Sequence, residues 1–108
     1  MIVEERIYRI RPGQMPSYLH LVSGEGSAIQ RPILRDLIGY FTTEIGPLNC
    51  VVHLRRFADL NDRAARRRTV AADRRWQESA RELSATIEVM DPARLSSVDG
   101  DRVQIWRK

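Results

Sequence analysis

The chain is poor in cysteine and lacks long apolar runs, and each absence excludes a class of protein. Its one cysteine, Cys50, excludes an internal disulfide framework and a cysteine-based zinc cluster. No stretch contains the roughly 18 apolar residues that a membrane-spanning helix needs. The N-terminal residues include acidic side chains and lack the apolar stretch of a secretory signal, so we expect a cytoplasmic protein without membrane association.

Motifs that mark cofactor sites are also missing. The sequence has no glycine-rich phosphate-binding loop, no nucleophile elbow and no tightly spaced set of His, Asp and Glu ligands. Its two histidines, His20 and His53, lie on different predicted elements. We therefore expect neither a metal ion nor another cofactor.

What remains is a basic chain of ordinary domain size. The 108 residues, of which 43% are apolar, predict a single domain over residues 1–108 with one core. Lys108 is the one lysine among 18 basic residues, so the formal net charge of +4 rests on arginine. Arginine is typical of bidentate anion contacts and of interface ion pairs. Composition therefore leaves open a nucleic-acid binder, an anion-binding enzyme and a domain whose ion pairs are structural.

Periodicity predicts six elements in the order strand, helix, strand, strand, helix, strand. They cover residues 2–11, 15–36, 37–45, 48–57, 59–86 and 86–90. Two glycines should make the first helical segment irregular at its centre, and Pro32 should start a new turn or kink it. Asp59 and Asp73 are candidate N-caps that divide the second helical segment in two. Residues 102–107 alternate and predict a short strand or a dimer-contact arm.

A hairpin links the two middle strands. Gly46-Pro47 fits a two-residue turn, and a four-residue loop would keep the same register. The expected pairs are Ile45 with Leu48, Glu44 with Asn49, Thr42 with Val51 and Tyr40 with His53. One face of the hairpin is predicted as core and carries Phe41, Ile45, Cys50, Val52 and Leu54. The other face is polar and aromatic and carries Tyr40, Thr42, Glu44, Asn49, His53 and Arg55.

This element order predicts a ferredoxin-like α+β sandwich with an antiparallel sheet. Helices should cover one face of the sheet, and something else must cover the other face. We expect the polar face to be the one without helices. A homodimer with two such sheets facing each other, as a dimeric α/β barrel, would enclose it.

Several motifs resemble the NIPSNAP family. The longest is Gly39-Tyr40-Phe41-Thr42-Thr43-Glu44-Ile45-Gly46-Pro47-Leu48-Asn49, followed by Val52-His53-Leu54. The others are Glu4-x-Arg6-x-Tyr8 before Pro12-Gly13, and Asp62-Arg63-x-x-Arg66-Arg67 before Asp73-x-x-Trp76. The resemblance spans residues 3–95 and implies a dimeric α+β barrel. We expect a bacterial protein. The resemblance implies no single activity or cofactor. Other dimeric α+β barrels bind haem, so haem stays open as an alternative that rests on fold analogy alone.

Two departures from the family pattern bear on the site and the backbone. Arg55 stands where the family often has Trp, which implies a more cationic polar face. Arg35 stands where the family often has Gly.

His53 is the leading candidate for acid–base chemistry, because imidazole exchanges protons near neutral pH. Its cross-strand neighbour Tyr40 can orient it, and Glu44 is a second candidate base if burial raises its pKa. The alternative is a structural histidine that is hydrogen-bonded to Tyr40 or to a carboxylate.

Arg6, Tyr8 and Arg55 are candidates for binding a carboxylate, an enolate or a carbonyl oxygen. Thr42 and Asn49 share the polar face and complete the predicted substrate site, although Asn49 can instead satisfy backbone groups at the turn. In the alternative interpretation, Arg6 pairs with a carboxylate of the same face, either Glu4 or Glu44.

The densest cluster of cations lies over residues 62–75. It fits either a phosphate-binding stripe or a solvated helix face on which Arg63 and Arg66 pair with Asp59 and Asp62. No aromatic residues are interspersed, which disfavours nucleic-acid binding. Cys50 alternates with apolar residues and is expected in the core.

The combined interpretation is a NIPSNAP-like homodimer that binds a small organic metabolite in the barrel or in the cleft under its helices. If the protein is an enzyme, we expect cofactor-independent isomerisation, cyclisation or oxygenation, with His53 as acid or base. The alternative is a non-enzymatic ligand-binding or protein-interaction module whose polar strand face is structural.

Overall fold

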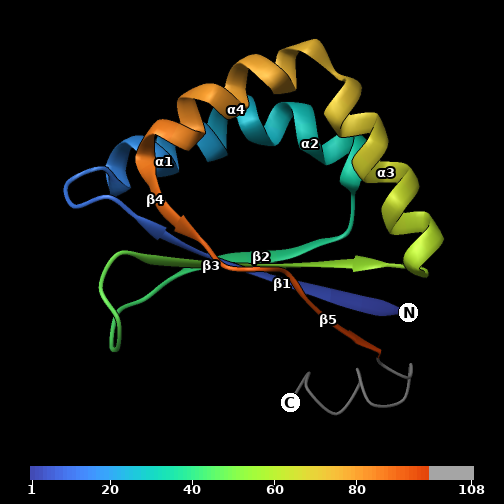
Figure 1. The fold of residues 1–108 in the computed structure, drawn as a ribbon, viewed down its shortest axis with the longest axis horizontal. Coiled ribbons are helices and arrows are strands. Elements are labelled where there is room, and N and C mark those ends of the chain that lie inside the picture. Colours follow the sequence, from blue (N-terminus) through green and yellow to red (C-terminus); the bar gives the residue numbers. More distant parts are fainter. Residues whose placement is uncertain (98–108) are drawn as a thin grey trace.

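One antiparallel sheet carries a layer of helices on one of its faces (Figure 1). This computed structural model describes residues 1–97. In chain order the elements are β1 (Ile2–Ile10), α1 (Met15–Leu21), η1 (Val22–Gly26), α2 (Ser27–Leu34), β2 (Leu37–Thr42), β3 (Cys50–Phe57), α3 (Leu60–Ala72), α4 (Arg74–Thr86), β4 (Ile87–Met90) and β5 (Arg94–Ser97). The strand order is β2-β3-β1-β4, with β5 also paired to β1. The predicted ferredoxin-like α+β sandwich is confirmed.

β1 is paired along both of its edges. On one side β3 pairs with β1 from Ile2 to Arg9. On the other side β4 pairs with the last residues of β1 and β5 pairs with the first ones. The sequence did not predict β5, because its four residues are all exposed and show no apolar alternation. The element predicted over residues 102–107 lies outside the described residues.

The register of the hairpin follows the prediction, but its loop is longer. Tyr40 pairs with His53 and Thr42 pairs with Val51. The strands separate beyond the hydrogen bond from Thr43 N to Cys50 O at 3.1 Å. Asn49 has φ +60°, and its carbonyl accepts a hydrogen bond from Ile10 N at 2.7 Å. Because this carbonyl is directed to β1, the expected pairs of Glu44 with Asn49 and of Ile45 with Leu48 do not form.

The first helical segment is irregular at its centre, as predicted. η1 contains the break, at Gly24, where φ −92° and ψ −108° are not helical. Pro32 instead lies within α2, which continues to Leu34. Arg35 follows with φ 49° and ψ −171°, a region that is essentially restricted to glycine. The chain leaves α2 through this strained residue and enters β2.

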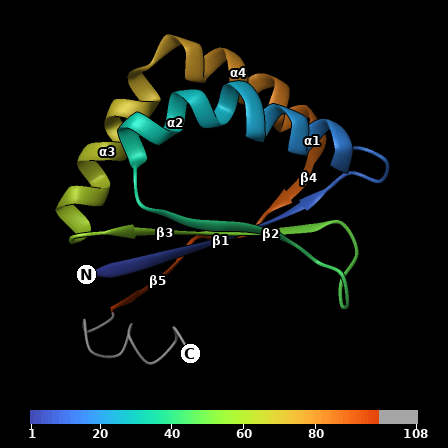
Figure 2. The same cartoon turned by 180° about the vertical axis from the view of Figure 1, so that it is seen from behind.

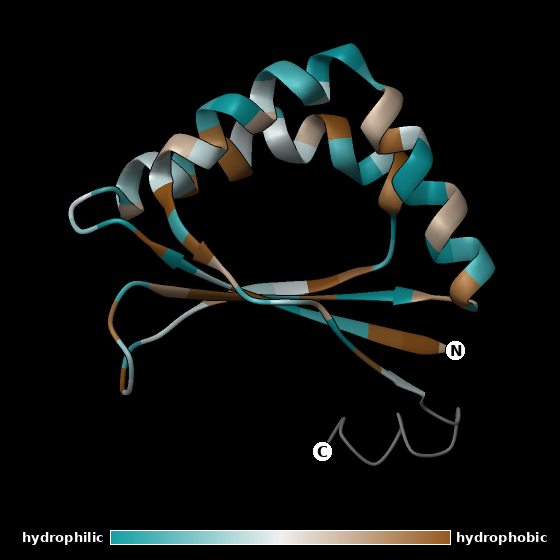
Figure 3. Ribbon diagram, in the orientation of Figure 1, coloured by the Kyte–Doolittle hydropathy of each residue, from teal (hydrophilic) through white to brown (hydrophobic). Residues whose placement is uncertain are grey.

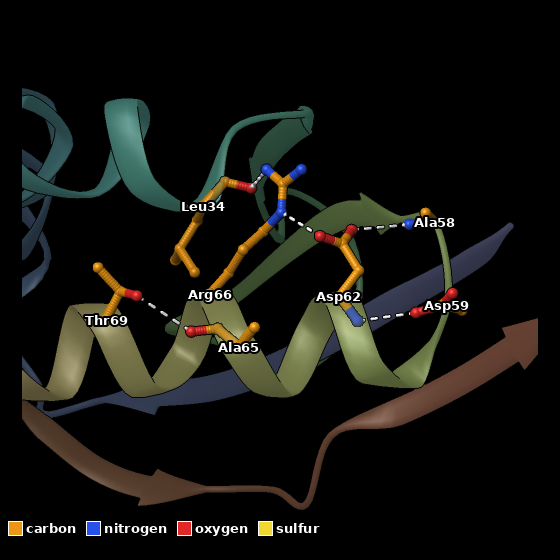
Figure 4. Close-up of polar contacts among 7 residues, drawn as sticks. All are labelled: Leu34, Ala58, Asp59, Asp62, Ala65, Arg66 and Thr69. Carbon is orange, nitrogen blue, oxygen red and sulfur yellow. Dashed lines mark hydrogen bonds and ion pairs between the residues drawn. The ribbon is translucent and has the colours of Figure 1, made fainter.

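The second helical segment divides into α3 and α4 at the predicted N-caps. Asp59 accepts a hydrogen bond from Asp62 N at 2.7 Å, and Asp73 accepts one from Trp76 N at 3.1 Å. Figure 4 shows the hydrogen bonds and the ion pair at the start of α3. Asp62 accepts from Ala58 N at 2.9 Å and forms an ion pair with Arg66 at 2.7 Å.

Arg66 also joins α3 to α2. Its Nη1 donates to the carbonyl of Leu34 at 3.2 Å (Figure 4). The last carbonyls of a helix have no partner within it, so this contact satisfies one of the groups left open at the end of α2. The predicted ion pair of Arg66 with Asp62 is confirmed. Arg63 forms its ion pair with Glu4 of β1 and not with Asp59.

The prediction of which sheet face is covered by helices was wrong. All helices lie on the same side of the sheet (Figure 1, Figure 2), and on β3 the buried residues that face them are Val51, His53, Arg55 and Phe57. Among the five residues predicted as core, Cys50 is buried. Phe41 is 53% exposed, and Ile45 lies in the exposed hairpin loop. Hydrophobic and hydrophilic residues are interspersed along the strands (Figure 3), and the face that hydropathy favours as core is the one without helices.

The polar face can be buried because the helices bring both apolar contacts and polar partners to it. One core cluster joins strands and helices through Ile10, Tyr18, Val51, Leu83 and Ile87. A second consists of Leu34, Phe57 and Val70, and Trp76 packs against both. Between these clusters lie the polar side chains of the candidate site.

Candidate functional site

A cavity of about 160 Å³ lies between the helices and the polar face of the sheet. The strands contribute alternating residues, which strand geometry directs to one face. From β1, β2 and β3 these are Glu4, Arg6, Tyr8, Tyr40, His53 and Arg55, and β4 adds Ile87 and Met90. The helices contribute, among others, Tyr18, Val22, Gln30, Arg67, Trp76, Ala80 and Leu83. Five of the residues predicted to form the site are therefore brought together, within one chain rather than between two sheets.

His53 lies at the centre of the strand residues of this cavity. It is 5% exposed, and it is the cross-strand neighbour of Arg6 on one side and Tyr40 on the other. The Tyr40 ring stacks on the imidazole with 4.6 Å between centroids and 4° between planes. Tyr8 contacts the imidazole edge-on at 5.1 Å. These rings fix the plane of the imidazole.

Neither nitrogen of His53 has a hydrogen-bond partner among the described residues. The expected hydrogen bond with Tyr40 is therefore replaced by stacking. Burial lowers the pKa of His53 to about 3, assisted by the positive charges of Arg55, Arg6 and Arg67. The imidazole is thus neutral at pH 7, with one nitrogen able to donate and the other able to accept. Buried polar atoms are normally satisfied, so these two nitrogens are available to a bound molecule.

Arg55 is a second buried group with unused hydrogen-bonding capacity. It is 4% exposed, and its Nη2 donates to Oε1 of Gln30 on α2 at 2.8 Å. Its Nη1 is buried and has no partner among residues 1–97. Arg6 donates from Nε to the Tyr8 hydroxyl at 3.0 Å. Within the described residues, no carboxylate forms an ion pair with Arg6 or Arg55.

Among residues 1–97, Glu4 is the one carboxylate that lines the cavity. It is 1% exposed and accepts a hydrogen bond from Nε of Arg63 at 2.6 Å. Nη1 of Arg67 lies 3.7 Å from its other oxygen, within ion-pair range but too far for a hydrogen bond. Glu4 thus joins the sheet to α3, and it pairs with these two arginines rather than with Arg6.

Two further tyrosines of the cavity remain protonated. Burial raises the pKa of Tyr18, and burial likewise raises the pKa of Tyr40 against the opposing charge of Arg55. Both side chains are therefore neutral phenols at physiological pH. A neutral phenol can donate one directed hydrogen bond to an oxygen of a ligand.

Three residues predicted for the site do not line the cavity. Thr42 is exposed at the end of β2, and Glu44 is exposed in the hairpin loop. Asn49 is half-buried at the base of that loop, where its carbonyl binds Ile10. Thr42 still pairs with Val51 in the sheet, but the cavity does not extend to it. The loop begins before Glu44 and ends after Asn49, so these two residues do not continue the alternation that places Tyr40 and His53 on the covered face.

The sequence interpretation missed Gln30 and Arg67 as cavity residues. Both lie on helices, and their direction depends on how α2 and α3 dock on the sheet. Glu4 was recognisable, because strand alternation places it on the same face as Arg6 and Tyr8.

The described residues contain no group of three or more His, Cys, Asp and Glu side chains arranged to hold a metal ion. The expectation of a cofactor-free protein stays a prediction. Among residues 1–97, no helix has the length and apolar character to cross a membrane.

The fold and the sequence both match known proteins. A NIPSNAP family protein of Agrobacterium tumefaciens, known from a crystal structure, is 54% identical, with 92% of this chain and 93% of that chain covered and a TM-score of 0.87. Human NipSnap homolog 3A is 32% identical over 69% of this chain. The chain spans 30% and 39% of the lengths of the curated relatives it matches, from Homo sapiens and Dictyostelium discoideum.

A more distant structure supports the fold alone. A Nitrosomonas europaea protein assigned to the antibiotic biosynthesis monooxygenases is 9% identical, with 91% of this chain and 98% of that chain covered and a TM-score of 0.66. The NIPSNAP family model itself matches residues 3–99. The chain therefore belongs to the NIPSNAP family.

Proposed function

We propose that the cavity under the helices binds a small organic molecule with a carbonyl or other oxygen group, and that His53 exchanges a proton with it. The observation that carries this proposal is a neutral, buried imidazole that lines a cavity with both nitrogens unpartnered. An unsatisfied buried group of this kind is costly to the fold and is typical of functional sites.

The size of the cavity limits the ligand. Drug-sized ligands occupy roughly 300–1,000 Å³, whereas an engineered cavity of about 150 Å³ accommodates benzene. At about 160 Å³, the present cavity suits a molecule of roughly six to ten non-hydrogen atoms. This excludes nucleotides and large aromatic cofactors as occupants of the cavity as it stands.

The proposed chemistry is cofactor-independent proton transfer, as in isomerisation, cyclisation or oxygenation of such a molecule. His53 would move the proton, and Tyr8 and Tyr40 hold its ring in place for this step. With a pKa of about 3 it is a weak base while the cavity is empty, so this role requires negative charge on the bound substrate to raise that pKa toward neutral. Arg6 and Arg55 would stabilise negative charge that develops on an oxygen of the substrate, in the manner of an oxyanion hole. Donors that are fixed before the reaction need no reorganisation during it.

We further propose that a second copy of the chain covers the face of the sheet without helices. Ile7, Val52 and Phe41 lie side by side across β1, β3 and β2 on that face. Apolar residues in such a row favour burial against another surface. The dimer would then enclose the apolar faces of two sheets, while each ligand cavity stays within one chain.

The proposal is tested by ligand-observed NMR with a library of small oxygenated metabolites. Ala80 lines the cavity, so Ala80→Phe should fill it and abolish the binding of any hit. Ala85 is exposed on the same helix, and Ala85→Phe should bind as the wild type does. Unchanged binding to Ala80→Phe would exclude the cavity as the site.

Turnover of a confirmed ligand then separates the two classes of function. Conversion by the wild type that is lost in His53→Gln supports acid–base catalysis by His53. Binding without conversion supports the alternative, a non-enzymatic ligand-binding module.

A further inference from the structure

We propose that the ligand of this cavity is an anion, a small carboxylate whose charge is held by Arg55 together with Arg6. This inference rests on the proposed function, because it names the class of molecule that the same cavity binds. It is carried by the imbalance of charge around the cavity.

Among the described residues, four guanidinium groups and one carboxylate lie at this site. Arg6, Arg55 and Arg67 line the cavity with Glu4, and Arg63 contacts Glu4 from α3. Glu4 is already shared by Arg63 and Arg67. The neutral His53 offers no negative charge. Arg6 and Arg55 are therefore left without a counter-ion among the described residues.

Arg55 is the more informative of the two, because it is almost completely buried. A buried charge is costly unless it is paired, and an uncompensated one destabilises the fold strongly. Its polar neighbours among the described residues are the amide of Gln30, which accepts from Nη2, and the phenol of Tyr40, and both of these groups are neutral. Nη1 makes no hydrogen bond within residues 1–97. Since Nη1 is buried in a residue that lines the cavity, a bound carboxylate is the group that would complete its environment. Arginine presents paired N–H groups that match the two oxygens of a carboxylate.

The rest of the lining indicates what the carboxylate is attached to. Val22, Trp76 and Leu83 contribute apolar surface from the helices. Apart from Gln30, Arg67 and Ser84, the helix residues of the lining are mostly apolar or aromatic, which fits an acid with a compact apolar or aromatic body beside the arginines of the strands. With the volume of about 160 Å³, this points to small monocarboxylic acids such as aromatic acids and branched keto acids.

The test compares three probes of nearly equal shape: benzoate, benzamide and benzylamine. Affinities are measured by ligand-observed NMR on the wild-type chain at pH 7.5. We expect benzoate to bind at least tenfold more tightly than benzamide, and benzylamine not to bind. If benzamide binds as tightly as benzoate, the anion inference is wrong while the proposed cavity site stands. If all three fail to bind at millimolar concentration, the inference is wrong, and the metabolite screen with Ala80→Phe decides the proposed function separately.

Two variants test whether Arg55 binds the carboxylate of benzoate. Gln30→Glu should supply Arg55 with an internal carboxylate and reduce the affinity for benzoate at least tenfold, with the affinity for benzamide unchanged. Arg55→Met, which removes the charge at similar length, should also abolish the preference for benzoate. Arg81→Met is the control, because Arg81 is exposed on α4 and does not line the cavity.

Thermal unfolding of each variant is recorded alongside, to show that the binding data come from folded protein. Gln30→Glu replaces the amide nitrogen with an oxygen and leaves the shape of the side chain unchanged. It therefore keeps the test valid if Arg55→Met does not fold. An unchanged preference for benzoate in a folded Gln30→Glu or Arg55→Met protein would overturn the assignment to Arg55.

Discussion

Acidification should destabilise this protein through His53, at a pH where its carboxylates are still mostly ionised. Burial and the neighbouring arginines lower the pKa of His53 to about 3 in the folded chain. In the unfolded chain the imidazole takes its ordinary pKa of about 6.5. Below pH 6.5 the unfolded chain therefore binds a proton that the folded chain does not. The contribution of His53 to stability is complete above pH 6.5 and is lost progressively as the pH falls toward 3.

The size of the effect follows from the two pKa values. Each pH unit between them is worth about 1.4 kcal/mol of unfolding free energy for one group. Between pH 7.5 and pH 5.0, His53 should therefore cost the fold about 2 kcal/mol. This is a large fraction of the stability of a small domain.

The measurement is urea unfolding at both pH values for three proteins. His20, the other histidine of the chain, is exposed, so His20→Gln is the matched control for His53→Gln. Changes that come from the carboxylates are common to all three proteins and cancel. We expect the wild type and His20→Gln to lose about 2 kcal/mol more than His53→Gln on acidification. Equal losses in His53→Gln and the wild type would refute a neutral, desolvated His53.

Three further predictions concern the scaffold. Arg35→Gly should stabilise the fold by about 1 kcal/mol in urea unfolding, because glycine adopts the backbone angles of this position without the strain that arginine has there. A destabilised variant would contradict the strained backbone angles of Arg35. Glu4→Gln should cost on the order of 2 kcal/mol in the same assay, because Arg63 and Arg67 lose their carboxylate, whereas the exposed control Glu78→Gln should be neutral. Phe41→Glu should convert a dimer to a monomer in analytical ultracentrifugation; an unchanged mass would argue against pairing through the uncovered sheet face.

Local patterns predicted most of the secondary structure. Asp59 and Asp73 begin α3 and α4 because an N-cap acts on backbone groups two or three residues away. The pairing of Tyr40 with His53 could be predicted because a hairpin register depends on the turn and on strand alternation. The extent of the loop could not be predicted from the sequence, since it depends on the hydrogen bond that Ile10 N in β1 donates to the carbonyl of Asn49.

The covered face could not be predicted from hydropathy. Phe41 and Val52 are more apolar than His53 and Arg55, so the rule that apolar residues are buried selects the wrong face. The polar face is buried because distant segments bring partners to it, such as Gln30 for Arg55 and Arg63 for Glu4. Such pairings link residues far apart in sequence, and no local pattern encodes them.

The strand half of the site was predictable and the helix half was not. Arg6, Tyr8, Tyr40, His53 and Arg55 share a face by alternation and register alone. Gln30 and Arg67 reach the cavity only through the docking of α2 and α3. Their identities nevertheless decide the charge of the cavity, and with it the proposed class of ligand.

The most direct test of a ligand beside His53 is an NMR titration of the two imidazole rings with benzoate. The central claim predicts that the His53 resonances shift with saturable dependence on benzoate concentration, while those of exposed His20 stay in place. It also predicts that bound benzoate raises the pKa of His53, because its charge offsets the nearby arginines. Benzoate that binds to the protein without moving the His53 resonances would contradict the claim.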